Sequence, residues 1–117
     1  MKPLNGIKVI DLTHMLAGPY AGMVIADLGA EVVKIEPLVT GEMTRGLLKT
    51  DPNYSYKGFG AYFLTLNRNK KSVSLDLKSQ EGLQVFYKLV KSADVVLNNF
   101  SAGVVKKLKV DFATLKK

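Results

Sequence analysis

The sequence predicts an α/β fold: a Rossmann-like, open and mainly parallel sheet with helices on both faces. Short strand-like runs at 7–12, 31–36, 72–77 and 94–97 alternate with stretches of helical periodicity. The first strand, helix and strand together occupy about thirty residues, the size of one βαβ unit. Strands joined in this way are parallel, and the crossover between them is right-handed.

The first helix is predicted to begin at Gly18-Pro19, with Pro19 at the first helical position, where its missing N–H does no harm. Its apolar positions share one face, which we expect to be buried: Ala21, Val24, Ile25 and Leu28. Gly29 is the expected left-handed stop. From 38 to 60 the sequence lacks periodicity, which predicts a long loop with one helical turn near 43–48.

The second half continues the pattern. Segment 62–66 is ambiguous between a strand and a helical turn, and 67–71 is a predicted polar turn whose charges face either solvent or a phosphate. The alternation of 72–77 predicts a half-buried strand near a sheet edge. Ser79 is the candidate cap of a helix with this apolar face: Leu83, Phe86, Tyr87 and Val90. The remaining predicted elements are a turn at 98–103 and helices at 104–108 and 112–117.

The composition excludes several kinds of site. The chain has 117 residues, no cysteine and one histidine, which excludes a disulfide framework and a cysteine nucleophile; we expect no metal. The net charge is +7, but the lysine-rich tail lacks the interleaved aromatics that stack bases, so we expect no nucleic acid partner. No signal-peptide pattern and no run of 18 apolar residues occur, so we expect a cytoplasmic protein without membrane association.

A ligand site is expected where the strands end, because open parallel sheets bind ligands at the carboxyl ends of their strands. These ends are predicted at Thr13-His14, Glu36-Pro37, Asp76–Lys78 and Asn98–Phe100. The turn after the first strand reads THMLAGP and lacks G-x-G-x-x-G, so a dinucleotide-dependent redox enzyme is not indicated. No orienting carboxylate accompanies His14 in the sequence, so we interpret it as a loop residue rather than an acid or base.

Several sequence blocks carry a resemblance to the class III CoA-transferases, the family of formyl-CoA transferase, carnitine CoA-transferase and α-methylacyl-CoA racemase. In order, they are PLNGIKVIDLTHMLAGPYAGMVIADLGAEVVKIEP, GEMTRG, YFLTLNRNKKSVSLDLKSQEG and ADVVLNNFSAGVVKKL. Several blocks in order are more specific than a single motif. The whole chain, 1–117, resembles the N-terminal, coenzyme-A-binding Rossmann-like part of the large domain, and is expected to be truncated; GEMTRG resembles the formyl-CoA branch.

The resemblance implies an acyl-CoA donor, a carboxylic acid acceptor and two interlinked subunits. It also implies an aspartate nucleophile that attacks the thioester carbonyl. None of the chain's aspartates matches that nucleophile: Asp11, Asp27, Asp51, Asp76, Asp94 and Asp111. We therefore expect coenzyme A binding without the catalytic residue. Alternatives are a stand-alone coenzyme A or nucleotide-binding module, a subunit completed by a partner chain, or an inactive truncation.

The resemblance further implies a set of coenzyme-A-binding residues: Leu16, Ala17, Leu75, Asp76, Leu77, Lys78, Asn99, Phe100, Ser101 and Lys107. Asn99 has the alternative of stabilising its own turn, and Lys107 that of a solvated basic face. Pro37 stands where some relatives carry a nucleotide-binding arginine, so that contact is not expected; Arg45 is either its substitute or a solvated surface charge. Ser101 also departs from the family pattern.

Overall fold

The computed structural model describes residues 1–116 and contains a four-stranded sheet. Its order is β5 (Lys70–Ser74), β2 (Glu31–Glu36), β1 (Lys8–Asp11) and β6 (Val95–Leu97). All three pairings are parallel, which confirms the predicted α/β class with an open parallel sheet. The strand predicted near a sheet edge, β5, is indeed an edge strand.

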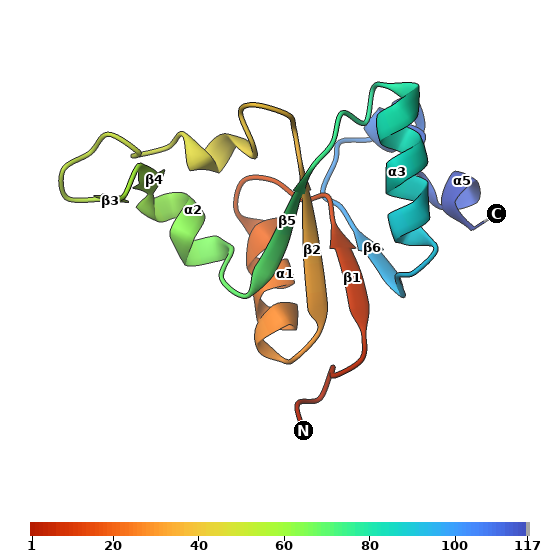
Figure 1. Ribbon diagram of the computed structural model, residues 1–117, viewed down its shortest axis with the longest axis horizontal. Helices are drawn as coiled ribbons and strands as arrows, with labels where there is room; N and C mark the ends of the chain where they lie inside the picture. Colours follow the sequence, from red (N-terminus) through yellow and green to blue (C-terminus); the bar gives the residue numbers. More distant parts are fainter. Residues whose placement is uncertain (117) are drawn as a thin grey trace.

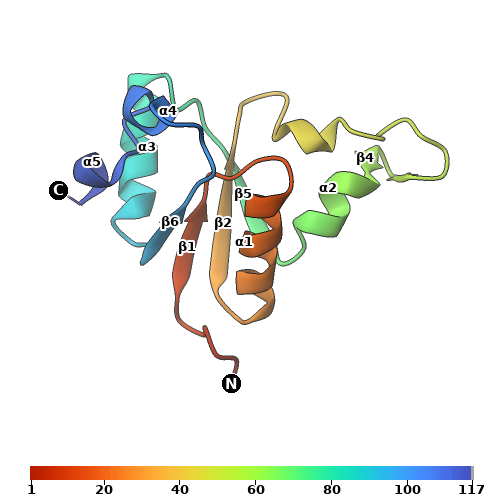
Figure 2. The same ribbon diagram turned by 180° about the vertical axis from the view of Figure 1, so that it is seen from behind.

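Helices lie on both faces of the sheet (Figures 1 and 2). They are α1 (Ala17–Asp27), α3 (Gln80–Val90), α4 (Val104–Lys107) and α5 (Phe112–Leu115). The remaining elements form what we call the arm, residues 43–66, which extends beyond β5 on the side away from α3 (Figure 1). The arm contains η1 (Met43–Arg45), β3 (Ser55–Tyr56), β4 (Phe59–Gly60) and α2 (Ala61–Leu66). No helix within residues 1–116 is long and apolar enough to cross a membrane.

Two hydrophobic cores sandwich the sheet, because successive residues of a strand point to opposite faces. The core on the α3 side is built on Ile10, Leu12, Val33, Ile35, Phe86 and Val110. The smaller core on the α1 side is built on Val9, Ala26, Ala30 and Val32. The predicted apolar face of α3 is confirmed, with Phe86 fully buried, and Ser79 caps this helix by accepting the Gly82 N–H at 3.0 Å.

The predicted start and buried face of α1 are wrong. The helix begins at Ala17, so Pro19 is its third residue. Val24 and Leu28 are exposed, at 37% and 41%. The buried residues are instead Gly18, Pro19, Gly22, Met23 and Ala26. Mostly small residues face the sheet because the helix packs close to it. The buried face was predicted from apolar side chains at helical spacing, and a face made largely of glycine and other small residues gives no such pattern.

The loop and turn predictions are partly wrong. The segment 38–60 contains the expected helical turn, as η1, but also the unexpected hairpin of β3 and β4. Its Lys57-Gly58 turn has positive φ at both residues, as two-residue hairpin turns commonly do. The sequence did not indicate a hairpin here, because such turns usually carry Asn-Gly or Asp-Gly. The ambiguous 62–66 is helical, and β5 spans 70–74 rather than 72–77, so part of the predicted polar turn is strand.

Candidate functional site

A cavity of about 880 Å³ opens where the strands end. Its walls come mainly from four segments, 12–14 after β1, 35–43 at and after β2, 75–78 after β5, and 100 after β6, and Leu108 at the end of α4 completes the lining. These are the four strand ends at which the sequence predicted a ligand site. The lining is mainly apolar, with a few polar groups, and the volume lies in the range of small-molecule sites.

The predicted site residues divide into two groups. Five of them line the cavity: Leu75, Asp76, Leu77, Lys78 and Phe100. The other five do not: Leu16, Ala17, Asn99, Ser101 and Lys107. Leu75, Leu77 and Phe100 also pack against the α3-side core, so these three side chains combine core packing with lining the cavity.

The polar groups of the lining differ in their availability. The carboxylate of Asp76 turns back and accepts the Lys78 backbone N–H at 2.9 Å. The Lys78 side chain is exposed at the cavity and forms no salt bridge within residues 1–116. The His14 ring stacks at a tilt on the Phe100 ring, with 5.5 Å between centroids. Because the Lys78 ammonium group is exposed at the cavity and belongs to none of the salt bridges of residues 1–116, it is placed to bind an anionic ligand.

At the base of the cavity, ionisable side chains lie on the α1 side of the sheet; all of them are buried except the half-buried Arg45, and Glu36 and Glu42 also line the cavity. We call this set the ionic layer: Asp11, Lys34, Glu36, Glu42, Arg45 and Lys70. It contains three carboxylates and three cations, so its charges balance. The strand members share the face of Val9 and Val32 by alternation and register.

Lys70 and Asp11 form the centre of the ionic layer. The Lys70 Nζ lies 2.9 Å from Asp11 Oδ2, and both side chains are essentially inaccessible, at 2% and 0%. Lys70 also donates to the Pro19 carbonyl at 2.8 Å and to Asn67 Oδ1 at 2.9 Å, so all three of its N–H groups have acceptors. Burial, the largest influence, lowers the pKa of Lys70, while the charge and hydrogen bond of Asp11 oppose that shift.

Glu36 and Arg45 form the second ion pair, between β2 and η1, in which Glu36 is buried and Arg45 is half-buried. Arg45 donates to both carboxylate oxygens of Glu36, at 2.6 and 2.7 Å, and its guanidinium lies 3.9 Å from the Phe63 ring centroid. Ser72 and the Glu42 N–H also donate to Glu36. Burial raises the pKa of Glu36, but these hydrogen bonds and the Arg45 charge outweigh it and lower the pKa from 4.5 to about 2. Arg45 is therefore a paired, half-buried charge rather than a solvated surface charge.

The backbone of loop 13–15 is held by side chains from other elements. Lys34, 1% exposed, donates to the Thr13 carbonyl at 2.7 Å. Asn99 bonds to both backbone groups of His14, and Glu42 accepts the Met15 N–H at 3.1 Å. The β1–α1 loop is thus fixed to β2, to the segment after β2 and to the segment after β6.

The sequence interpretation missed the ionic layer. One signal was available: the β1 and β2 strands are central in the sheet, so Asp11, Lys34 and Glu36 inside them must be buried whichever face they take. Lys70 carried no such signal, because it follows a polar run and reads as part of a turn. Its burial depends on the pairing of β5 with β2, which local sequence does not reveal.

Each aspartate of the chain bonds to another group of the protein: Asp11, Asp27, Asp51, Asp76, Asp94 and Asp111. Within residues 1–116, Asp76 is the only one of them that lines the cavity. The candidate site therefore has one aspartate at its surface, beside the cavity-lining Glu36 and Glu42, and the Asp76 carboxylate is hydrogen-bonded in its own turn.

The comparisons with known proteins cover almost the entire chain. The model of CoA-transferase family III matches residues 4–117. A formyl-CoA:oxalate CoA-transferase from Afipia carboxidovorans is 39% identical over 99% of this chain and 26% of the relative. A succinyl-CoA:mesaconate CoA-transferase from Haloarcula hispanica is 40% identical over 99% of this chain and 29% of the relative.

The solved structures give the same pattern. A CAIB/BAIF family protein from Brucella suis superposes with a TM-score of 0.87 at 39% identity, covering 98% of this chain and 30% of that protein. The chain thus spans between a quarter and a third of the length of the relatives that it matches.

Proposed function

The chain belongs to CoA-transferase family III, and we propose that it forms the coenzyme-A-binding part of an acyl-CoA:carboxylate CoA-transferase. The observation that carries the proposal is the cavity at the carboxyl ends of the parallel strands, lined by five of the ten residues that the family resemblance implies. In this proposal the ligands are an acyl-CoA and a carboxylic acid, and coenzyme A is part of the substrate rather than a resident cofactor.

The cavity lining matches the chemistry of the proposed ligand. Leu75, Leu77 and Phe100 offer apolar surface to the adenine ring. Lys78 supplies a point charge for a phosphate. Leu16 and Ala17, at the start of α1, are exposed and lie beside the cavity wall, where their backbone N–H groups are available to an anion. Ser101 and Lys107 are exposed and act on the outer part of the ligand.

The catalytic aspartate, in this proposal, is supplied from outside this set of residues. The support is that each aspartate of the chain already bonds to another group of the protein. We further propose that the working assembly contains two copies of the complete polypeptide and acts in the cytoplasm. Both inferences rest on the family, in which the two relatives named above are about three to four times as long as the matched segment.

Calorimetric titration with coenzyme A tests the proposed binding. We expect binding by the unaltered chain, and about tenfold weaker binding by Lys78→Ala, because a hydrogen bond to a charged group contributes about 1.5–3 kcal/mol. Lys88→Ala is the matched control: Lys88 is an exposed lysine on α3 outside the cavity lining, and its removal should leave the affinity unchanged. Equal losses in the two variants, or no binding by the unaltered chain, would contradict the proposal.

A second candidate is a coenzyme-A-binding module without transferase activity of its own. Such a module either acts alone or forms a complete enzyme with a partner chain that supplies the catalytic residue. The favouring observation is that Asp76, the one aspartate that lines the cavity within residues 1–116, is hydrogen-bonded in its own turn. The two candidates share the cavity and differ in catalysis. An assay of coenzyme A transfer separates them when it is run with and without a second polypeptide, namely the part of a relative that this chain does not match.

A further inference from the structure

Asn99 bridges two strand ends at the rim of the cavity. Its side-chain oxygen accepts the His14 N–H at 3.0 Å, and its side-chain amide donates to the His14 carbonyl at 2.8 Å. The two residues are 85 positions apart, and they follow β6 and β1, which pair in the sheet. Both polar ends of the amide are therefore already bonded to the cavity wall.

Glu42 holds the next residue of the same loop from the other side. Its carboxylate, in a residue only 3% exposed, accepts the Met15 N–H at 3.1 Å and the Thr44 hydroxyl. Met15 has φ 68°, a left-handed conformation that residues other than glycine rarely adopt. Strained residues of this kind persist where surrounding groups fix them, and they cluster at ligand sites.

We propose that Asn99 and Glu42 are positioning residues, which hold loop 13–15 in the conformation that forms the cavity wall and so set the affinity for the ligand through that loop. The proposal rests on the proposed function, because coenzyme A is the ligand concerned. It gives Asn99 a role different from the direct nucleotide contact that the family resemblance implies. Its physical basis is that a loop correctly placed only part of the time reduces the apparent affinity by that fraction.

Asn99→Ala tests the proposal with Asn98→Ala as its matched control. Both residues are exposed asparagines after β6, but Asn98 bonds to the Phe100 N–H at 3.3 Å rather than to His14. Two quantities are measured: amide hydrogen exchange of the ligand-free protein, and the Kd for coenzyme A. We expect Asn99→Ala to speed exchange at the His14 amide at least tenfold and to weaken coenzyme A binding by about five- to tenfold. Asn98→Ala should change neither by more than about twofold.

Glu42 is tested by a conservative rescue. Glu42→Gln keeps a side-chain oxygen that can accept the Met15 N–H, whereas Glu42→Ala removes it. We expect Glu42→Ala to expose the Met15 amide to exchange and to weaken binding about tenfold, and Glu42→Gln to retain most of both. Because Glu42 is buried, circular dichroism of each variant establishes that it is folded before binding is compared.

Each outcome decides the proposal. Unchanged His14 exchange in Asn99→Ala together with weaker binding assigns Asn99 to direct ligand contact and overturns its positioning role. Faster His14 exchange with unchanged affinity overturns the link between the loop and the ligand. If the unaltered chain binds no coenzyme A, the proposed function fails, and exchange at His14 and Met15 alone then decides whether the two side chains hold the loop.

Discussion

Placing six ionisable side chains at the base of a cavity, five of them buried, requires that each find a partner, because an unpaired buried charge is strongly destabilising. Glu36 is the clearest case. Its side chain is 1% exposed, and it accepts hydrogen bonds from Arg45, Ser72 and the Glu42 N–H. These donors favour the ionised carboxylate over the protonated one. The pKa of Glu36 therefore falls from 4.5 to about 2 despite burial, and folding stability becomes linked to pH through this residue.

The pH dependence follows from the direction of that shift. A carboxyl whose folded pKa lies below its unfolded value contributes stability above pH 4.5, and this contribution disappears as the pH falls toward 2. The shift corresponds to roughly 3 kcal/mol. Urea denaturation should show Glu36→Gln less stable than the unaltered chain by about this amount at pH 7, with the difference shrinking between pH 5 and pH 2. Glu81→Gln, which alters an exposed carboxylate in the first turn of α3, should show no such convergence. A constant difference for Glu36→Gln across this pH range would contradict the assignment.

At the scale of elements, the packing of α1 follows from the ionic layer. A Cβ added at Gly22 would lie 2.7 Å from Asp11 Oδ2 and 3.2 Å from Lys70 Nζ, and one at Gly18 would overlap Thr13. Only glycine allows the helix to approach the buried ion pair this closely. The helix consequently turns its small residues inward, and Tyr20, at 55%, is among the larger apolar side chains left exposed.

Gly22→Ala should therefore destabilise the protein, although alanine normally improves a helix interior by up to about 1 kcal/mol. We expect a loss of about 2 kcal/mol, as in other overpacked cores, and a fall in Tm of roughly 10 °C by differential scanning calorimetry. Gly46→Ala is the control, since a Cβ there would meet its nearest neighbour, the Met43 carbonyl, at an ordinary 3.5 Å. A stabilised Gly22→Ala protein would show that α1 is free to move away from the ion pair.

The same packing explains which parts of the fold the sequence predicts. The four strand ends and the α3 face follow from local periodicity, and the cavity lies where the strand ends were expected. The buried face of α1 does not follow, because it is chosen by Asp11 and Lys70, which come from two strands far apart in the sequence. The role of Asn99 was ambiguous for a similar reason, since its partner His14 lies 85 positions away.

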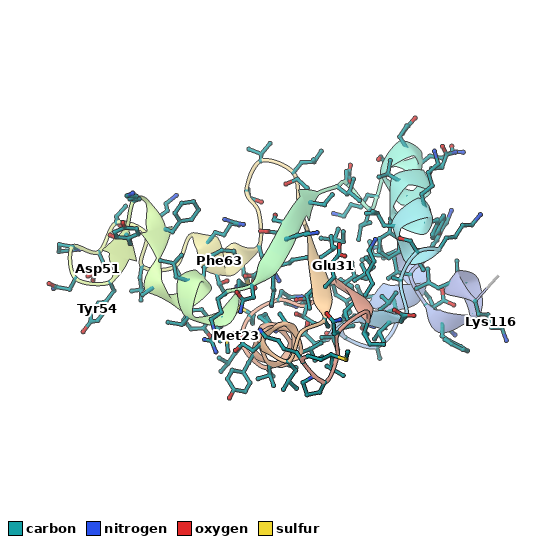
Figure 3. The ribbon with its side chains drawn as sticks, turned by 60° about the horizontal axis from the view of Figure 1, so that its bottom comes forward. Met23, Glu31, Asp51, Tyr54, Phe63 and Lys116 are labelled. Carbon is teal, nitrogen blue, oxygen red and sulfur yellow. The ribbon has the colours of Figure 1, made fainter. Side chains whose placement is uncertain are left out.

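At the scale of the whole molecule, the arm begins at the cavity with Met43 and extends away from it. Figure 3 places Asp51 and Tyr54 at the outer end of the arm, with Lys116 at the opposite end of the molecule and Phe63 nearer the sheet. Arg45, stacked on Phe63 and paired with Glu36, connects the arm to the end of β2. Hence the segment that carries Glu42 and Met43 in the cavity wall is held between the end of β2 and the rest of the arm.

The distribution of aspartates over this architecture predicts binding without transfer. A carboxylate that attacks an acyl-CoA thioester must reach the carbonyl carbon with an unshared oxygen; the new C–O bond gives a mixed anhydride as the C–S bond breaks and coenzyme A leaves as its thiolate. Among the chain's aspartates, Asp76 alone lines the cavity within residues 1–116, and it is turned toward the Lys78 backbone. We expect that incubation with an acyl-CoA followed by hydroxylamine leaves every aspartate unmodified in a peptide mass map, and that no coenzyme A passes to an added carboxylic acid.

Asp76→Asn provides the control for that experiment, because it removes the one cavity-lining aspartate while keeping an oxygen that can accept the Lys78 N–H. Its mass map should equal that of the unaltered chain, and its affinity for coenzyme A should change by less than about threefold. A hydroxamate at Asp76 in the unaltered chain, absent from Asp76→Asn, would identify this residue as a nucleophile and overturn the proposal that the catalytic carboxylate comes from elsewhere. The cavity would then be a complete reaction site, since the attacking group and the bound thioester would share the strand ends of one sheet.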